Sequence, residues 1–193
     1  MINKLILASA SPRRKELLEL VGLEFEVVPG DVDEAFHEAE TPRDHVMRLS
    51  REKALAVSAM HPDAWVLGAD TIVLVNGEIL GKPQTGDEAR EMLRKLSGRM
   101  HRVLSGFTVL KKNGGAVFTD AVESTVVFKN LSADEIEWYA GTDEPYDKAG
   151  GYAAQGIGAS LIREIRGSYT NVVGLPLCEV VDALRQMGAA RCC

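Results

Sequence analysis

Cysteine is scarce in this chain, and the three cysteines present favour neither a disulfide framework nor a metal site. Cys178 stands alone in an apolar stretch, while Cys192 and Cys193 are adjacent at the end of the sequence. An odd number of cysteines with this spacing is not typical of a disulfide-stapled domain or of a zinc site. We therefore expect a fold without disulfide bonds, in which Cys178 fills part of the core.

Long apolar runs are also missing. No stretch approaches the roughly 20 apolar residues that a membrane-spanning helix needs. The apolar segment that follows Met1 is too short for a secretory signal and is followed by no small-residue cleavage site. The sequence therefore predicts a cytoplasmic protein with no membrane partner.

Positive charge is in deficit, because 22 lysines and arginines face 28 aspartates and glutamates, for a net charge of -6. General nucleic-acid binders usually carry a basic face, so we expect no nucleic-acid partner. The basic residues that are present recur in a few loops. Local positive charge in an acidic protein favours a pocket for a small anion over a surface for a long polyanion.

The pattern of apolar residues predicts an α/β fold over residues 1–193 as a single domain with two lobes around a cleft. Predicted strands and helices alternate in the first part of the chain, and strands cluster in its middle, which indicates an elongated, mixed, twisted sheet flanked by helices. We expect strands at 5–8, 25–28, 65–69, 71–75, 103–110, 116–122, 123–128 and 161–165. We expect helices at about 12–21, 42–60, 86–96, 133–140 and 176–187.

The loop between the first strand and the first helix reads Ser-Ala-Ser-Pro-Arg-Arg and carries Ser9, Arg13 and Arg14. A helix N-terminus offers free N–H groups and a positive dipole end, and hydroxyl and guanidinium groups match phosphate oxygens. A phosphate-binding turn and a well-capped surface helix with two solvated arginines are both consistent with the segment. The glycines and the Lys-Ser/Thr pair of a Walker A loop are missing, which argues against a kinase or motor-type ATPase.

Asp70 follows the apolar run 66–69 and precedes Thr71, Ile72 and Val73. A carboxylate at the end of a buried strand is costly unless it is paired, binds a metal or faces a cleft. The strand ends of α/β sheets are also where ligands bind. A local turn bond is the alternative, but the apolar residues on both sides favour a functional carboxylate.

Three further charged residues are candidates. Glu34 lies in an acidic cluster that suits Mg²⁺, whose preferred ligands are oxygens, although a solvated cluster is the alternative unless Asp70 lies nearby. Lys53 lies inside the second predicted helix, where a solvated side chain is the usual alternative. Lys82 sits in a Gly-Lys-Pro turn that fixes the backbone and presents the amine.

Two loops near the end of the chain complete the set. The loop at 147–156 is rich in glycine, which lets the backbone approach a ligand closely, and its Gln155 offers the paired donor and acceptor that a base edge requires. The loop at 167–176 again runs into a helix with proline at its start. Either loop alone is consistent with ordinary turn chemistry, but together with Asp70 they favour a site.

The histidines are scattered, with no metal spacing between them and no Ser-His-Asp order. We therefore expect them to be structural or exposed. They are His37, His45, His61 and His101.

Six segments, in order along the chain, together resemble the Maf family of nucleotide pyrophosphatases. One visible departure is Ser105, where the family usually has threonine, and the hydroxyl is retained. The matching segments are residues 9–14 (SASPRR), 69–71 (ADT), 81–83 (GKP), 96–98 (LSG), 147–150 (DKAG) with Gln155, and 171–176 (NVVGLP).

The resemblance implies hydrolysis of nucleoside triphosphates between the α and β phosphates, which gives a monophosphate and pyrophosphate and requires a divalent metal, commonly Mg²⁺ or Mn²⁺. It implies an elongated mixed α/β fold with a central cleft, akin to inosine triphosphate pyrophosphatases, and a homodimer is one expected assembly because dimers are common in the family. Asp70 matches the family's proton acceptor, and Glu34 and Asp70 match the positions associated with the metal. The implied substrate-binding residues are Ser9, Arg13, Arg14, Lys53, Thr71, Lys82 and Gln155.

Arg13, Thr71 and Gln155 match the positions that accompany dTTP and UTP preference in the family, so the resemblance implies house-cleaning of pyrimidine nucleotides. The 7-methyl-GTP group usually carries a different residue after Ser-Pro and reads Ser-Asp where this chain reads Ala-Asp-Thr at 69–71. Two alternatives stay open. One is a non-catalytic nucleotide-binding regulator of cell division, since the family name comes from septum formation. The other is a pyrophosphatase for another base, such as 7-methyl-GTP or inosine triphosphate.

Overall fold

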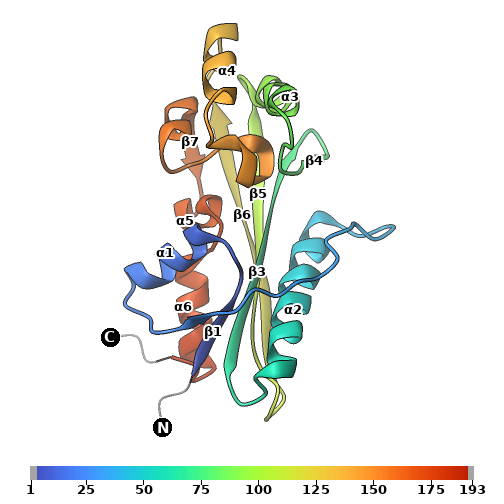
Figure 1. The fold of residues 1–193 in the computed structure, drawn as a ribbon, viewed down its shortest axis with the longest axis vertical. Helices are drawn as coiled ribbons and strands as arrows, with labels where there is room; N and C mark the ends of the chain where they lie inside the picture. The colour runs from blue at the N-terminus through green and yellow to red at the C-terminus, as the bar shows by residue number, and fades with distance from the viewer. Residues whose placement is uncertain (1–3, 191–193) are drawn as a thin grey trace. The chain divides into compact units, whose positions relative to one another are not determined.

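The computed structural model describes residues 4–190 and has the predicted mixed α/β architecture (Figure 1). Its α-helices are α1 (Pro12–Leu20), α2 (Pro42–Met60), α3 (Gly86–Leu96), α4 (Ala133–Ala140), α5 (Tyr169–Val173) and α6 (Leu177–Gln186). Its strands are β1 (Leu5–Ala8), β2 (Glu26–Val27), β3 (Trp65–Val75), β4 (Glu78–Leu80), β5 (Met100–Lys111), β6 (Ala116–Phe128) and β7 (Ile162–Arg166). Short 3-10 turns cover Pro145–Asp147, Ala149–Gly151 and Ile157–Leu161.

The strands form one mixed sheet of seven strands, in the order β2-β1-β3-β5-β6-β7, with β4 paired to β3. β1 runs parallel to both β2 and β3, in the register Ile6 to Glu26 and Leu7 to Leu67. The β3–β4 and β6–β7 pairs are antiparallel. The prediction of a mixed sheet flanked by helices is confirmed.

Local capping chemistry begins the helices where the sequence predicts. The hydroxyl of Thr41 accepts a hydrogen bond from the first turn of α2. Ser132 and Glu135 form a reciprocal capping box at α4. At α3, Thr85 accepts from the Glu88 amide, but the Glu88 carboxylate accepts from the residue before Thr85, so that predicted box is only half formed.

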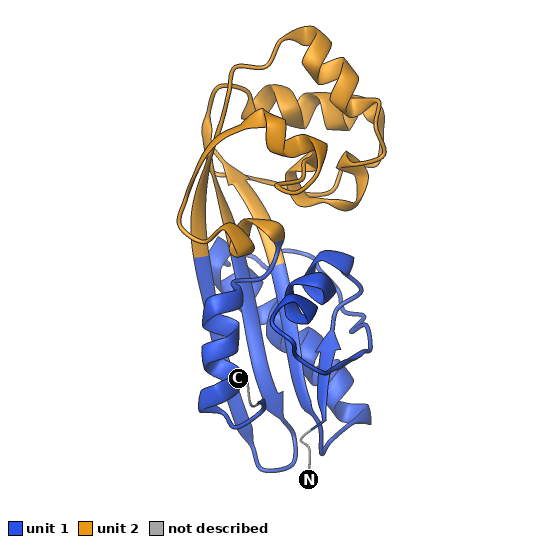
Figure 2. Cartoon of the chain, turned by 90° about the vertical axis from the view of Figure 1, so that its left-hand side faces the viewer, with its two compact units in different colours: residues 1–70, 105–122, 174–193 blue, residues 71–104, 123–173 orange. Residues whose placement is uncertain are grey.

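The chain divides into two compact units (Figure 2). Unit 1 contains residues 1–70, 105–122 and 174–193, and unit 2 contains residues 71–104 and 123–173. β3, β5 and β6 each contribute residues to both units. The predicted cleft between two lobes stays a prediction.

Unit 1 is built on the close approach of α2 to the sheet. A Cβ atom at Gly68 of β3 would collide with the backbone carbonyl of Ser50, and one at Gly106 of β5 would collide with that of Val46. Only glycine at these two positions lets the helix backbone lie directly on the strands. Buried aliphatic side chains fill the space around this contact and form one cluster, which consists of Ile6, Ala8, Ala54, Val57, Ala64, Val66 and Leu110.

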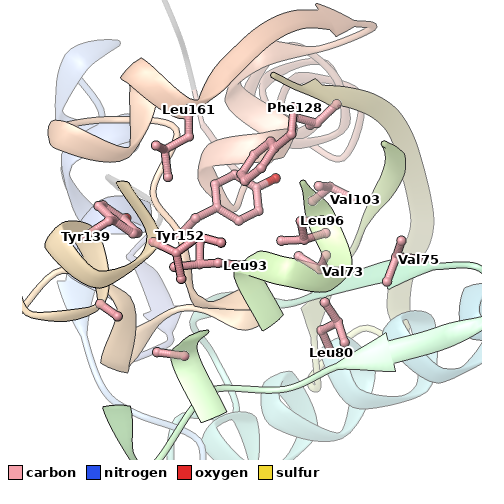
Figure 3. Packing of buried hydrophobic residues seen from close by; sticks show 14 residues of the cluster. Val73, Val75, Leu80, Leu93, Leu96, Val103, Phe128, Tyr139, Tyr152 and Leu161 are labelled. Atoms are coloured by element: carbon pink, nitrogen blue, oxygen red, sulfur yellow. The ribbon is translucent and has the colours of Figure 1, made fainter. Parts of the chain in front are cut away.

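Unit 2 has its own core, in which α3 and α4 contact each other and pack with the sheet residues of this unit (Figure 3). Tyr139 and Phe128 are among its largest buried side chains. The ring of His101 lies edge-on to the rings of Phe128 and Tyr152, and its Nε2 lies 2.7 Å from the Tyr152 hydroxyl. A buried imidazole is therefore part of an otherwise apolar core.

The structure corrects several predicted boundaries. β3 continues without interruption through Asp70, so this residue lies within the strand and not at its end. β6 is likewise one strand where the sequence predicts two, and β5 begins at Met100. The loop at 167–176 contains helix α5. A carboxylate interrupts an apolar pattern in the sequence, but it does not interrupt a strand when a neighbouring cation neutralises it.

Cys178 is exposed, so its predicted place in the core is wrong. It occupies the second position of α6, whose inward positions are taken by Leu177, Val180, Ala183 and Leu184. Cys192 and Cys193 lie outside the described residues. Among residues 4–190, no helix combines the length and the apolar character that crossing a bilayer requires.

We expect His101 to make stability depend on pH. Burial lowers the pKa of His101 from 6.5 to about 4, so the unfolded chain binds a proton between these values and the folded chain does not. Stability is therefore present above pH 6.5 and falls as the pH drops towards 4, by about 2 kcal/mol at pH 5. Denaturant unfolding of His101→Gln should show a smaller loss between pH 7.5 and pH 5 than the wild type.

Tyr152→Phe is the matched control, because it removes the hydrogen-bond partner and keeps the imidazole. It should unfold more easily at both pH values and retain the pH dependence. An equal slope in His101→Gln and the wild type would contradict the assignment.

Candidate active site

Lys53 and Asp70 form a buried ion pair within unit 1. The Lys53 Nζ lies 2.7 Å from Asp70 Oδ1, and each residue is only 7% exposed. Lys53 belongs to the buried stripe of α2, with Leu49 and Val57 one turn away on either side. A buried charge is stable only with a partner, and removing one member of such a pair costs about 3–5 kcal/mol.

The same ammonium group holds a second carboxylate, because Lys53 Nζ lies 2.6 Å from Glu34 Oε1. Glu34 is largely exposed, with 59% of its side chain accessible. The structure thus brings together three residues that the sequence selects separately, Glu34, Lys53 and Asp70. It also removes the solvated alternative for Lys53.

The two oxygens of Asp70 are in different situations. Oδ1 accepts from Lys53, whereas Oδ2 makes no hydrogen bond to any described residue. An ionised carboxylate with one oxygen held and the other available is suited to accept a proton from a water molecule.

Arg14 is buried beside this pair and is bound by protein oxygens. Its Nη1 donates to Ser9 Oγ and to the Ala69 carbonyl, and its Nε donates to the Gly174 carbonyl, all at 2.9 Å. Burial lowers the pKa of Arg14, and the charge of Asp70 opposes this shift. Arg14 therefore joins three segments that lie far apart in the sequence, and the predicted contact between Arg14 and substrate stays a prediction.

The hydroxyl of Ser9 completes this arrangement. It accepts from Arg14 and, at 3.3 Å, from the Ser11 amide, so its own proton remains available for a further acceptor. Ser11 occupies the N-cap of α1, although its side chain makes no capping bond. Arg13 is half-buried in the first turn of the same helix.

The loop that carries Glu34 is fixed to α2 by residues that sequence reasoning missed. Arg48 donates to both oxygens of Glu40, at 2.6 and 2.9 Å, and to the Ala35 carbonyl at 2.9 Å. These bonds from Arg48, joined by one from His45, lower the pKa of Glu40 to about 2. The spacing of three residues between His45 and Arg48 on a predicted helix was the available signal, because it places both on one face.

Glu34 and Asp70 supply oxygen ligands of the kind that Mg²⁺ and Mn²⁺ prefer. Among residues 4–190 there is no group of three or more side chains suited to hold a metal ion. Magnesium is usually bound by one or two carboxylates together with substrate phosphates and water. Two carboxylates that share one ammonium group are therefore consistent with an ion that is completed by a phosphorylated substrate.

Unit 2 brings together two other predicted segments. The Gly150 amide donates to the Gly81 carbonyl at 2.9 Å, which joins the Gly-Lys-Pro turn to the glycine-rich loop. A Cβ atom at Gly151 would lie 3.3 Å from the ring of Pro83, so the backbone of Gly151 lies close to this ring. Lys82 is exposed in this turn, and its amine has no partner among the described residues.

Gln155 lies in the same glycine-rich loop. It is half-buried, and within the described part of the chain its amide makes no hydrogen bond. Thr71 directly follows Asp70 in β3 and is also half-buried. The structure therefore describes two groups of candidate residues, one in each unit, and the substrate contacts of both groups stay predictions.

The segment at 171–176 has a structural explanation. Asn171 is fully buried in α5, and its Nδ2 donates to the Val103 carbonyl and to Ser124 Oγ, at 3.1 and 3.0 Å. Gly174 accepts from Arg14 in unit 1. The loop is thus held at both ends by hydrogen bonds to buried groups.

Comparison with known proteins identifies the relatives of this chain. The family model described as "Maf-like protein" matches residues 4–187. A dTTP/UTP pyrophosphatase of Syntrophus aciditrophicus (strain SB) is 58% identical over 98% of this chain and 92% of its own. A dTTP/UTP pyrophosphatase of Geotalea uraniireducens (strain Rf4) is 56% identical over 97% and 96%. Among solved structures, a HAM1 protein from Coxiella burnetii shares the fold at a TM-score of 0.53 and 15% identity, over 95% of this chain and 99% of that one.

We expect Gly68→Ala to disturb the Lys53–Asp70 pair. The added Cβ would collide with the Ser50 carbonyl and lie 2.9 Å from Ala54, so α2 must move away from β3. Overpacking of this kind costs about 1–3 kcal/mol. Denaturant unfolding should show this loss, and hydrogen exchange should be faster around residues 50–54.

Gly81→Ala is the control, because a Cβ atom at Gly81 meets nothing within 4 Å. It should leave stability unchanged or raise it by a few tenths of a kcal/mol, as expected for a substitution that restricts only the unfolded chain. Equal effects of the two substitutions would refute the close-approach argument.

Proposed function

This chain belongs to the Maf family, and from that premise we propose that it hydrolyses dTTP and UTP between the α and β phosphates, releasing pyrophosphate and the nucleoside monophosphate. The observation that carries the proposal is the buried Asp70, with one oxygen held by Lys53 and the other available to a water molecule. The names of the relatives support the choice of dTTP and UTP. The cellular role that follows is removal of unwanted pyrimidine nucleotides.

Charge neutralisation is the first task of such a site, because a triphosphate carries about four negative charges that repel an attacking water. Lys53 and Lys82 supply cationic side chains, and the N-terminus of α1 supplies amide donors. Ser9 contributes a hydroxyl proton to a phosphate oxygen. Arg14 keeps the Ser9 hydroxyl and the Ala69 carbonyl in place through its hydrogen bonds to both.

Proton transfer is assigned to Asp70. As the water oxygen bonds to the α-phosphorus, its proton passes to Asp70 Oδ2, and the bond from the α-phosphorus to the oxygen bridging to the β-phosphate breaks. The electron pair of that bond leaves with pyrophosphate. The ammonium group of Lys53 holds Oδ1 throughout, which fixes the carboxylate in its plane.

A divalent ion, Mg²⁺ or Mn²⁺, is part of this proposal, with Glu34 and Asp70 as its protein ligands. When bound, it would neutralise phosphate charge and polarise the α-phosphate. Arg48 and Glu40 hold the loop of Glu34 against α2, which keeps that ligand near Lys53.

Selectivity for the pyrimidine is assigned to Arg13, Thr71 and Gln155. The Gln155 amide offers one donor and one acceptor edge, as the Watson–Crick edge of uracil or thymine requires. A purine would be too large or would leave a polar group unpaired, and an unpaired group is the strongest source of discrimination.

The location, the partners and the assembly of the protein are proposed from its acidic composition and its family. The protein acts on free nucleotides in the cytoplasm, without a nucleic-acid or membrane partner, and a homodimer is its proposed assembly. Sedimentation of the purified chain tests the assembly, and salt-sensitive binding to duplex DNA would contradict the absence of a nucleic-acid partner.

Asp70→Asn should retain the fold and lose turnover. Removing a general base lowers the rate by about 100-fold or more, so pyrophosphate release from dTTP should fall by at least this factor. Lys53 keeps Glu34 as a partner, which limits the loss of stability. Asp63→Asn is the control and should have the wild-type rate, because Asp63 is an exposed aspartate of the same unit whose side chain accepts a hydrogen bond from Asn113. A wild-type rate in Asp70→Asn would remove this residue from the mechanism.

A panel of nucleoside triphosphates tests the reaction and its specificity together. We expect pyrophosphate release from dTTP and UTP well above release from ATP, GTP and 7-methyl-GTP in the presence of Mg²⁺ or Mn²⁺, and loss of release on chelation. Tight nucleotide binding without release from any of them would favour the regulator. Preferred release from 7-methyl-GTP would overturn the pyrimidine assignment.

A further inference from the structure

Glu144 lies eleven residues before Gln155 in the sequence and is bound to the loop that carries it. Its Oε2 accepts from the Gly158 amide at 2.7 Å, and its Oε1 accepts from the Ile157 amide at 2.9 Å. Oε2 also accepts from the Tyr139 hydroxyl at 2.7 Å. Three donors therefore converge on one carboxylate, and two of them are backbone groups just after Gln155.

Tyr139 extends this contact to the other side of Gln155. Its hydroxyl oxygen accepts from the Ala153 amide at 3.0 Å, and its ring is fully buried in the core of unit 2 (Figure 3). The residues on both sides of Gln155 are thus held by one hydrogen-bonded pair. We call Glu144, Tyr139 and the amides of Ala153, Ile157 and Gly158 the Glu144 network.

The loop is shaped to fit this network. Gly156 has a φ of +81°, and a Cβ atom there would collide with Glu144 Oε1. A Cβ atom at Gly158 would lie 2.6 Å from the Tyr139 hydroxyl oxygen. The glycines after Gln155 are therefore required by contact with Glu144 and Tyr139, whatever ligand the loop binds.

Glu144 is itself held in place. Its carbonyl accepts from Lys148 Nζ at 2.7 Å, and Pro145 fixes the backbone that follows. Burial raises the pKa of the Glu144 carboxyl, but the hydrogen bonds from Tyr139, Gly158 and Ile157 together outweigh it and the net pKa is lowered. The group is therefore a carboxylate at neutral pH and acts only as an acceptor.

We propose that Glu144 is a positioning residue for base selectivity, because its carboxylate fixes residues 153–158 so that the unpartnered Gln155 amide is presented in a single orientation. The inference rests on the proposed function, in which Gln155 contacts the pyrimidine. Hydrogen bonds weaken steeply when the angle at the donor departs from linearity. A mobile loop would therefore lose discrimination between bases before it lost the hydrolytic chemistry assigned to unit 1.

Glu144→Gln is the decisive variant. Glutamine has the same shape as glutamate, but its NH₂ group replaces one carboxylate oxygen and cannot accept the hydrogen bonds that this oxygen accepts. We expect kcat/KM for dTTP to fall about tenfold, mainly through KM, while kcat/KM for GTP changes little, so that the ratio between the two substrates contracts by a similar factor. Hydrogen exchange of the amides at 153–158 should be faster than in the wild type.

Two further variants separate positioning from general stability. Tyr139→Phe removes one donor to Glu144 and the acceptor of Ala153, and it should give a smaller effect in the same direction. Ile136→Ala truncates a buried residue of the same helix, α4, without removing any bond of the Glu144 network. It should lower the melting temperature and leave the dTTP to GTP ratio unchanged.

The outcomes distinguish this inference from the proposed function. If the wild type releases no pyrophosphate from dTTP, the proposed function fails, and faster exchange at 153–158 in Glu144→Gln still supports the fixing of the loop. If the wild type is active and Glu144→Gln keeps both its substrate ratio and its exchange rates, the inference is overturned. If Glu144→Gln does not fold, Tyr139→Phe decides by the same two measurements, and an unchanged ratio there also overturns it.

Discussion

The close approach of α2 to the sheet is the constraint on which the proposed chemistry depends. Gly68 and Gly106 have no side chains, so the helix backbone lies directly on β3 and β5. At this distance Lys53, from the buried stripe of α2, reaches Asp70 in β3. A longer separation would take the ammonium partner away from the buried carboxylate of Asp70, which is far less stable than the pair. The close packing of α2 on the sheet therefore also determines the ion pair of the site.

The geometry of the site depends on polar residues that bind other protein groups as much as on polar groups that remain available for a ligand. Arg14 donates to Ser9, Ala69 and Gly174, and Arg48 donates to Glu40, Ala35 and Glu52. In unit 2, Glu144 has the corresponding role as an acceptor. Lys82, Gln155 and Asp70 Oδ2 have no such partners among the described residues. Fixed neighbours on rigid elements are what allow a few free groups to be held in a productive geometry.

Much of the fold follows from local patterns in the sequence. Apolar periodicity and capping residues place α2, α3 and α4 at nearly their observed bounds, because a helix begins where side chains such as Thr41 and Ser132 satisfy its free amides. The sequence also indicates Asp70, Lys53 and Glu34 as candidate residues, and the structure places them together. Local patterns fail where an interaction partner is distant in sequence. The continuity of β3 through Asp70 is one example, since a carboxylate is tolerable there because Lys53 pairs with it.

The sequence alone determined the class of fold, the family, and the candidate catalytic and binding residues, because these depend on periodicity, composition and motifs that are local. What only the tertiary structure decided is which of these residues contact each other. Arg14 donates to the Gly174 carbonyl, 160 positions away in the sequence. No sequence motif indicates the Glu40–Arg48 pair or the Glu144 network. The physical reason is that hydrogen bonds and ion pairs are set by distances in space, and the folding of β-strands and α2 brings distant residues within those distances.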